Sequence, residues 1–191
     1  MLPILKRELK ENNDLKISWM ETPKKKYHSK IHGASLFPDL VLVHYGSSKY
    51  KSELFREVKN ENWVKPRGGL WTSPLKSNWG WKDWCLAENF RTCDESDSFN
   101  LKFKDEAKIL VIDSLQDLEM IPKSKVAYSK RFSKEYPDFE LLAKECDAIW
   151  LTESGQRETH LSHPLSLYGW DCESVLILNP NCCYEVTSTL I

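Results

Sequence analysis

The sequence predicts a single α+β domain with a mixed, mostly antiparallel, split β-sheet at its core and helices on its flanks. Its 191 residues, 41% of them hydrophobic, are enough for one core that buries roughly 70% of the surface of the unfolded chain. Short apolar runs interleave with segments of helical spacing, and the pattern lacks the regular alternation of βαβ units. We expect the domain to span residues 31–191, after a polar, lysine-rich segment at residues 1–30 that forms an outer helix or an arm.

Four segments in the first half have a clear pattern. Short apolar runs predict buried strands at 38–47 and 66–74, the second of them bounded by prolines. Apolar residues three and four positions apart predict helices at 49–63 and 80–90. We expect the tryptophan-rich side of the second helix to face the core.

Strand patterns dominate the second half. In chain order we expect a strand at 98–104, a strand and a short helix within 107–122, a helix at 138–145, a strand at Ala148–Leu151, a strand at 172–179 and a last strand at 182–190. The polar segment 153–171 has no periodicity and is predicted to be a long loop, a feature that is often functional in compact domains.

Charge and hydropathy argue against several classes of protein. The 27 Lys and Arg residues nearly balance 28 Asp and Glu residues, whereas a general nucleic-acid binder is usually basic. No apolar run approaches the roughly 18 residues of a membrane span. The first residues, MLPILKRELKENND, lack the apolar core of a signal peptide. We therefore expect a cytoplasmic protein with no membrane partner.

The cysteines lack the Cys-x-x-Cys spacing of structural zinc sites. Without a secretory signal, an even number of cysteines is expected to stay reduced. We therefore expect no structural metal, and buried free thiols at Cys85, Cys93, Cys146, Cys172, Cys182 and Cys183.

Six of the seven glycines lie near or inside candidate site segments, and only Gly33 stands apart. His44 ends an apolar run just before Gly46, and Gly68 and Gly69 precede Trp71. Glycine allows a ligand to approach the backbone closely, and an aromatic ring beside it is suited to stack on a flat ligand. Histidines at strand ends also serve as structural hydrogen-bonding residues, and most tryptophans belong to cores, so both interpretations stay open.

Glu173 follows the polar segment 153–171 and stands at the start of an apolar strand. A carboxylate held there is rigid and partly desolvated, which suits it to stabilise developing positive charge or to act as a base. The alternative is an edge glutamate that faces water.

Three motifs follow one another in a characteristic order: HYGS at 44–47, GGLWTSP at 68–74, and Glu173 at the start of a strand. This set, within residues 38–186, resembles the ADP-ribosyltransferase superfamily. The closest resemblance is to its diphtheria-toxin-like and poly(ADP-ribose)-polymerase-like branch, in which strands with His, Tyr and Glu hold NAD.

Two positions depart from the pattern of that branch. Trp71 stands where the family usually has tyrosine, and Tyr45 separates the histidine of the first motif from its glycine. Thr72 and Ser73 are similar to the Ser-Thr-Ser strand of the arginine-using toxins, so the branch stays open.

The resemblance implies a catalytic set of His44, Trp71 and Glu173 around NAD. His44 would hydrogen-bond the adenosine-side ribose, and Trp71 would flank the nicotinamide ring. Gly46 would offer its backbone to the carboxamide, with Ser47 nearby. Glu173 would bind the 2′-hydroxyl of the nicotinamide ribose and favour an oxocarbenium-like transition state. Further NAD contacts are implied for Tyr45, Gly69, Leu70, Ser73 and Trp79.

Candidates for acceptor contact precede the glutamate, as in the family. Asp171 lies two positions before Glu173, so both side chains are expected on one side of a strand, although Asp171 also suits a loop cap. Gln156, Arg157 and Tyr168 are further candidates, and Arg157 is also suited to grip a pyrophosphate. Lys65 is a candidate for contact with a phosphate, and the alternative is that it is an ordinary surface charge.

The resemblance therefore implies an NAD-dependent ADP-ribosyltransferase, with NAD glycohydrolase activity as a companion reaction. It transfers ADP-ribose to a protein, a nucleic acid or a small molecule. A bacterial toxin paired with an antitoxin, an immunity effector and a phage-encoded modifier of a host target all fit such chemistry. The alternative is a non-catalytic module that binds a nucleotide or a partner through an aromatic pocket.

Overall fold

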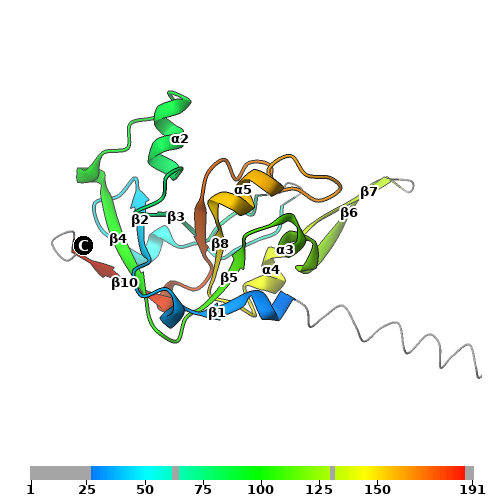
Figure 1. Cartoon of the computed structure of the whole chain (residues 1–191), viewed down its shortest axis with the longest axis horizontal. Helices are drawn as coiled ribbons and strands as arrows, with labels where there is room; N and C mark the ends of the chain where they lie inside the picture. The colour runs from blue at the N-terminus through cyan, green and yellow to red at the C-terminus, as the bar shows by residue number, and fades with distance from the viewer. Residues whose placement is uncertain (1–26, 62–64, 130–131, 188–191) are drawn as a thin grey trace, which may run out of the picture.

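The computed structural model describes residues 27–61, 65–129 and 132–187. It confirms an α+β fold around one mixed, mostly antiparallel sheet (Figure 1). The strands of this sheet are β1 (Ile31–Gly33), β2 (Val41–Tyr45), β3 (Leu70–Pro74), β4 (Ser98–Phe103), β5 (Lys108–Ile112), β8 (Ala148–Leu151), β9 (Ser174–Ile177) and β10 (Cys183–Val186). Their spatial order is β1-β5-β8-β9-β3-β2-β4-β10, in which β5 and β8 are parallel and the other neighbouring pairs antiparallel.

Short helices connect these strands in the described part of the chain. The α-helices are α2 (Trp81–Ala87), α3 (Leu115–Met120), α4 (Phe139–Leu142) and α5 (Glu153–Thr159). The 3-10 helices are η1 (Tyr27–Lys30), η2 (Ala34–Leu36), η3 (Ser52–Leu54), η4 (Glu95–Asp97) and η5 (Pro180–Cys182). Helix α2 projects beyond the sheet, whereas α3, α4 and α5 lie beside β5 and β8 (Figure 1).

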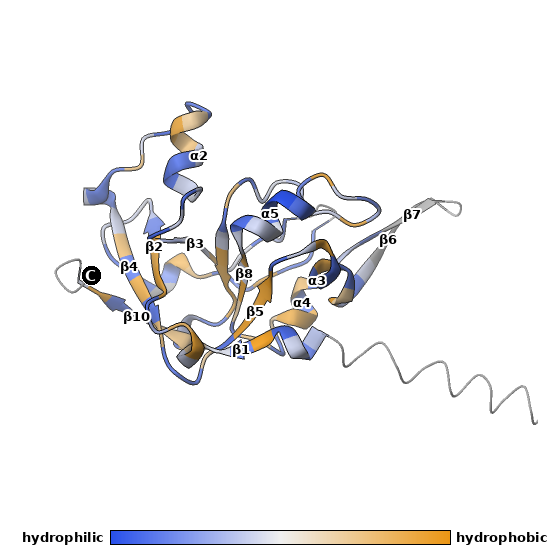
Figure 2. Cartoon of the chain, in the orientation of Figure 1, coloured by the Kyte–Doolittle hydropathy of each residue, from blue (hydrophilic) through white to orange (hydrophobic). Residues whose placement is uncertain are grey.

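A hydrophobic core covers each face of the sheet. Side chains of β9 alternate between the two cores, since Leu176 belongs to the first core and its neighbours Val175 and Ile177 to the second. Leu118 of α3 and Leu142 of α4 complete the first core. Figure 2 shows the apolar residues along β5 and α4 and the hydrophilic residues of α5. Burial on both faces explains why β5, β8 and β9 appear in the sequence as continuous apolar runs.

Most predicted elements are confirmed with shorter bounds. The runs at 38–47, 66–74 and 172–179 contain β2, β3 and β9, and Ala148–Leu151 is β8. The strand and helix expected within 107–122 are β5 and α3. The flanking residues of these segments enter turns, so an apolar run marks a strand better than it marks the ends of that strand.

The helix predicted at 49–63 is wrong for its described residues, which form the short turn η3, irregular backbone and an isolated β-bridge from Lys59 to Arg67. Leu54 and Phe55 pack against the second core, whereas Val58 belongs to the first. A helix would place these three side chains on one stripe. The chain is not helical here because its apolar residues fill cores on opposite faces of the sheet.

The loop predicted at 153–171 is wrong in its first part, where α5 begins. Thr152 caps this helix, because its side-chain oxygen accepts a hydrogen bond from the Gly155 amide at 3.1 Å. The sequence of α5, ESGQRET, contains no large apolar residue, so it has no hydrophobic period. Its close contact with the sheet depends on Gly155, since a Cβ there would lie 2.1 Å from the Ile112 carbonyl oxygen.

Other parts of the fold have no counterpart in the predicted elements. Strands β6 (Lys123–Ser129) and β7 (Phe132–Pro137) form a separate antiparallel hairpin that extends from the body (Figure 1). Residues 1–26 of the predicted arm lie outside the described residues, and Tyr27 of η1 is buried in the first core.

Replacing Gly155 tests the packing of α5. Gly155→Ala is expected to lower the free energy of unfolding by about 1–3 kcal/mol, because the new methyl group meets the backbone of β5. Urea denaturation measures the change. Ser154→Ala, in the same helix, is the control and is expected to change the free energy by less than about 0.5 kcal/mol. A Gly155→Ala midpoint equal to that of the wild type would contradict the close packing.

Candidate active site

The site begins where β2 and β3 separate. These strands pair only at Leu42 with Pro74 and at Val43 with Ser73. Beyond these pairs, His44 Nδ1 lies 2.8 Å from the carbonyl oxygen of Trp71. A carbonyl oxygen can only accept, so Nδ1 carries the hydrogen and donates it. This side-chain bond joins the two halves of the sheet where their backbones no longer pair.

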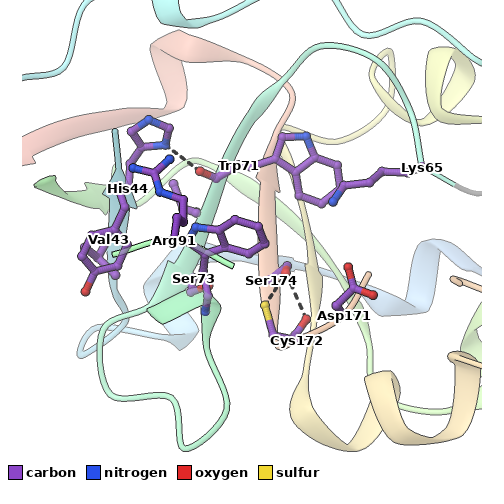
Figure 3. Close-up of a pocket in the computed structure, with 12 residues that line it drawn as sticks. Val43, His44, Lys65, Trp71, Ser73, Arg91, Asp171, Cys172 and Ser174 are labelled. Atoms are coloured by element: carbon purple, nitrogen blue, oxygen red, sulfur yellow. Dashed lines mark hydrogen bonds between the residues drawn. The ribbon is translucent and has the colours of Figure 1, made fainter. Parts of the chain in front are cut away.

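A pocket of about 260 Å³ lies at this separation (Figure 3). It is bordered by residues of β2 and β3, the segment leading into β9, Trp81 at the start of α2, and two side chains from connecting segments. The lining residues are Val43, His44, Tyr45, Lys65, Trp71, Thr72, Ser73, Trp81, Arg91, Asp171, Cys172 and Ser174. The structure therefore brings the first two sequence motifs and the segment around Glu173 to one pocket.

Two cationic side chains line the pocket. Lys65 Nζ donates to the Gly169 carbonyl oxygen at 3.1 Å and lies 4.5 Å from the centre of the Trp71 ring. Burial lowers the pKa of the Lys65 ammonium, and the nearby Asp171 carboxylate opposes that shift. Arg91 reaches the pocket from the segment after α2. Together these cations favour a ligand that carries negative charge.

His44 has a lowered pKa in this environment. Burial is the main cause, and the positive charge of Arg91 acts in the same direction. The hydrogen bond to Trp71 opposes the shift. The centre of the His44 ring lies 5.0 Å from the centre of the Phe99 ring, and this contact packs His44 against the second core. A neutral imidazole with hydrogen on Nδ1 leaves Nε2 as an acceptor.

Glu173 does not line this pocket, and its side chain is only 8% exposed. Its Oε1 accepts from Trp150 Nε1 at 2.9 Å, and its Oε2 accepts from the Ser77 hydroxyl at 2.5 Å. The prediction that Asp171 and Glu173 share a side is wrong, because Asp171 lines the pocket and Glu173 does not. The strand alternation begins later, with Ser174 as the first residue of β9.

The backbone of Glu173, like its carboxylate, is fixed by hydrogen bonds. Its amide donates to the Trp79 carbonyl oxygen at 2.9 Å, and its carbonyl oxygen accepts from the Ser73 hydroxyl at 3.0 Å. Trp79 Nε1 donates to the Asp171 carbonyl oxygen at 3.2 Å. Trp79 therefore ties the segment after β3 to the segment before β9, and it does not line the pocket.

A second pocket of about 400 Å³ adjoins the first. The two share Val43, Tyr45, Ser73 and Trp81, so they form two lobes of one cleft. The second lobe is more polar, and it is lined in addition by Pro74, Leu75, Ser77, Gly80, Lys82, Asp83, Glu95, Ser98 and Asn100. Ser77 contributes to this wall and holds the Glu173 carboxylate behind it.

Other residues with predicted NAD contacts lie beside the pocket rather than in its lining. The Gly46 amide donates to the Asp97 carbonyl oxygen, and the Ser47 hydroxyl donates to the Lys49 carbonyl oxygen. Gly69 has a φ of +65°, and a Cβ there would lie 2.4 Å from Leu176.

Leu70 is also absent from the lining, since it is buried in the second core. Gly69 and Leu70 therefore serve the packing of β3 against β9.

The acceptor candidates separate into two groups. Asp171 lines the first lobe, whereas Gln156, Arg157 and Tyr168 line neither lobe. Arg157 forms an exposed ion pair with Glu153 on α5 at 2.5 Å. Tyr168 is 61% exposed and its ring lies 5.3 Å from that of His160.

Sequence reasoning did not single out Arg91, Ser77 or Trp150. Each lies outside the three motifs, and each reaches the site only through the tertiary fold. Trp81 was expected on a core-facing side of its helix, but it lines both lobes and belongs to neither core. The sequence signal that could have placed Trp81 in the site is its position shortly after the second motif in the chain.

No family model, curated protein or solved structure matches this chain. Across residues 27–61, 65–129 and 132–187, no helix is long and apolar enough to cross a membrane. The same residues contain no cluster of three or more His, Cys, Asp or Glu side chains that could hold a metal ion. All six cysteines are free, as predicted, and Cys93 is half-buried rather than buried.

The lowered pKa of His44 predicts a pH dependence of stability. The unfolded chain takes up this proton more readily, so the stability contributed by neutral His44 is complete above about pH 6.5 and is lost as pH falls from there through the folded-state pKa. His44→Asn keeps an N–H donor for Trp71 and does not titrate. We expect its free energy of unfolding to fall less than that of the wild type between about pH 7 and about pH 5.

Denaturant titrations across this range measure the difference. His163→Asn, at an exposed histidine, is the control and should retain the fall of the wild type. Identical pH profiles for His44→Asn and the wild type would contradict the burial-induced shift.

Proposed function

We propose that this protein is an NAD-dependent ADP-ribosyltransferase that holds NAD in the cleft between β2, β3 and β9. The observation that carries the proposal is the meeting of three motifs that are far apart in the sequence. Their strands are neighbours in the order β9-β3-β2, and His44, Trp71 and the residues on both sides of Glu173 border one pocket.

The cleft offers the groups that a dinucleotide requires. Trp71 and Trp81 border the first lobe, and tryptophan rings are suited to contact a flat nicotinamide ring. Lys65 and Arg91 supply positive charge for a pyrophosphate. The hydroxyl and amide groups of the second lobe, such as Asn100, suit a ribose. Two adjoining lobes of a few hundred Å³ match the usual size of small-molecule sites.

In this proposal Glu173 binds the 2′-hydroxyl of the nicotinamide ribose after a local exchange. The hydroxyl of Ser77 now donates to Glu173 Oε2 at the wall of the second lobe. A ribose hydroxyl is the same kind of donor, so it can replace Ser77 without leaving the carboxylate unpaired. Trp150 keeps its bond to Oε1 and holds the carboxylate in place.

The reaction needs few groups from the protein. The bond between ribose C1′ and the nicotinamide nitrogen breaks, and its electron pair leaves with neutral nicotinamide. Positive charge then develops on the ribose, where a fixed carboxylate such as Glu173 stabilises it. A nucleophile of the acceptor bonds to C1′ and loses its proton.

A second candidate function is a module that binds a nucleotide without cleaving it. The observation in its favour is that both carboxylate oxygens of Glu173 already have donors and the side chain does not line the first lobe. In such a module, Glu173 fixes the segment before β9, and the cations and tryptophans bind the ligand.

Release of nicotinamide from NAD tests the proposal. The purified protein is incubated with NAD labelled in its nicotinamide part, with and without a cell lysate as the source of acceptors. We expect nicotinamide release by the wild type, and a loss of at least about hundredfold in Glu173→Gln. Glu119→Gln, at an exposed glutamate on α3, is the control and should match the wild type.

Calorimetric titration with NAD separates the two candidates. The transferase proposal predicts that Glu173→Gln binds NAD but does not cleave it. Binding by the wild type with no release of nicotinamide, with or without lysate, would contradict the transferase and favour the binding module. No binding of NAD by a folded wild type would contradict the transferase, and no binding of adenine nucleotides either would contradict the binding module as well.

A further inference from the structure

The chain places one of its own cations on the Trp71 ring. Lys65 Nζ lies over this ring, 4.5 Å from its centre. Both residues line the first lobe of the cleft, and Figure 3 shows the Lys65 side chain beside the Trp71 indole. A flat ligand can stack on this face of Trp71 only after the ammonium has moved away.

Three groups stabilise positive charge at the position of the Lys65 ammonium. The face of an indole ring attracts cations. The Gly169 carbonyl oxygen accepts a hydrogen bond from Lys65 Nζ at 3.1 Å. The Asp171 carboxylate also lines the first lobe, and it opposes the lowering of the Lys65 pKa by burial. This position therefore suits a cation that also donates a hydrogen bond.

Trp71 is the fixed member of this pair. Its backbone pairs with Leu176 of β9, and its carbonyl oxygen accepts from His44. Its ring also contacts the ring of Trp170, with centres 4.5 Å apart, and Trp170 is buried in the first core. A ligand that reaches the face of Trp71 is therefore expected to displace Lys65 and to leave the indole in place.

Lys65 is held by few contacts. Its ammonium carries three donors, and within the described residues it has one hydrogen bond, to Gly169. The four-carbon stem of a lysine is flexible. Burial lowers the Lys65 pKa, which means that the charge loses hydration inside the lobe and regains it on leaving. The ammonium can therefore leave the Trp71 face at a small cost in free energy.

We propose that the face of Trp71 under Lys65 is a subsite for a flat aromatic cation, which displaces the Lys65 ammonium when it binds. The pyridinium ring of oxidised nicotinamide has the required properties, since it is planar, carries positive charge and bears a carboxamide. The carboxamide N–H can donate to the Gly169 carbonyl oxygen in place of Lys65. The identification of this ligand as the nicotinamide of NAD rests on the proposed function, whereas the preference for an aromatic cation rests on the contacts of the subsite alone.

The exchange also favours release of the product. Breaking the bond to ribose leaves the nicotinamide ring neutral, so the ring loses the attraction of a cation to the Trp71 face and to the Asp171 carboxylate. The Lys65 ammonium keeps its charge and returns to the face. Lys65 therefore competes with substrate and product for one position.

Calorimetric titration with N-methylnicotinamide, a pyridinium cation, tests the subsite on the full-length protein without NAD. We expect Lys65→Ala to bind this probe about tenfold more tightly than the wild type, because the face of Trp71 is then always open. We also expect Lys65→Ala to bind the probe about tenfold more tightly than neutral nicotinamide, the difference that a desolvated cation–π contact supplies. Lys65→Met keeps the apolar part of the side chain without the charge and should show a gain of the same sign.

Three further variants serve as controls. Lys65→Arg keeps a cation over the ring and should bind the probe no more tightly than the wild type. Arg91→Ala removes the other positive charge of the first lobe but leaves Lys65 over Trp71, so its affinity for the probe should rise by less than about threefold. Lys104→Ala, at an exposed lysine outside both lobes, should match the wild type.

The proposal is overturned if Lys65→Ala binds the probe no more tightly than the wild type, or if it does not prefer the probe to nicotinamide. An equal gain in Arg91→Ala would also overturn it. The result is separable from that of the NAD assay. A gain in Lys65→Ala without release of nicotinamide from NAD would contradict the transferase and leave the subsite standing. Release of nicotinamide without the gain would contradict the subsite alone.

Discussion

The hydrogen bond from His44 to the Trp71 carbonyl oxygen is the contact on which the candidate site depends. β2 and β3 share only two backbone pairs, and this bond joins them where they separate. A sheet that stayed fully paired would leave no room for a pocket between β2 and β3. The bond also fixes the tautomer of His44, and burial keeps the ring neutral, so one residue supports the fold and presents an acceptor beside the cleft.

The Glu173 carboxylate gives the site its second constraint. Burial of a carboxylate is costly unless donors compensate it, and Ser77 and Trp150 provide them. These donors come from the segment after β3 and from β8, so the carboxylate ties together elements on both sides of β9. A ligand that binds the Glu173 carboxylate must donate a hydrogen bond that replaces the one it displaces. This requirement favours a hydroxyl-bearing ligand and connects the stability of the segment before β9 with the chemistry of the cleft.

Sequence patterns predicted the strands whose apolar residues are buried in the sheet. They failed for segments whose buried residues do not recur at a helical or strand spacing. β8 and β9 are apolar runs that are buried on both faces and are evident from sequence alone. The 49–61 segment divides its apolar residues between two cores, and α5 contains none. In the site, the structure brings His44 and Trp71 to one pocket. The direction of Glu173 and the arrival of Arg91 depend on turns and tertiary contacts that have no sequence pattern.

The central claim is that the cleft between β2, β3 and β9 holds NAD within reach of Glu173. The most direct test is a crystal structure with an NAD analogue whose bond between nicotinamide and ribose cannot be cleaved. The account predicts the nicotinamide ring against Trp71 and a ribose hydroxyl bound to the Glu173 carboxylate in place of Ser77. An analogue bound elsewhere would contradict it. So would an analogue in the cleft with its ribose out of reach of Glu173 and the bonds to Ser77 and Trp150 intact.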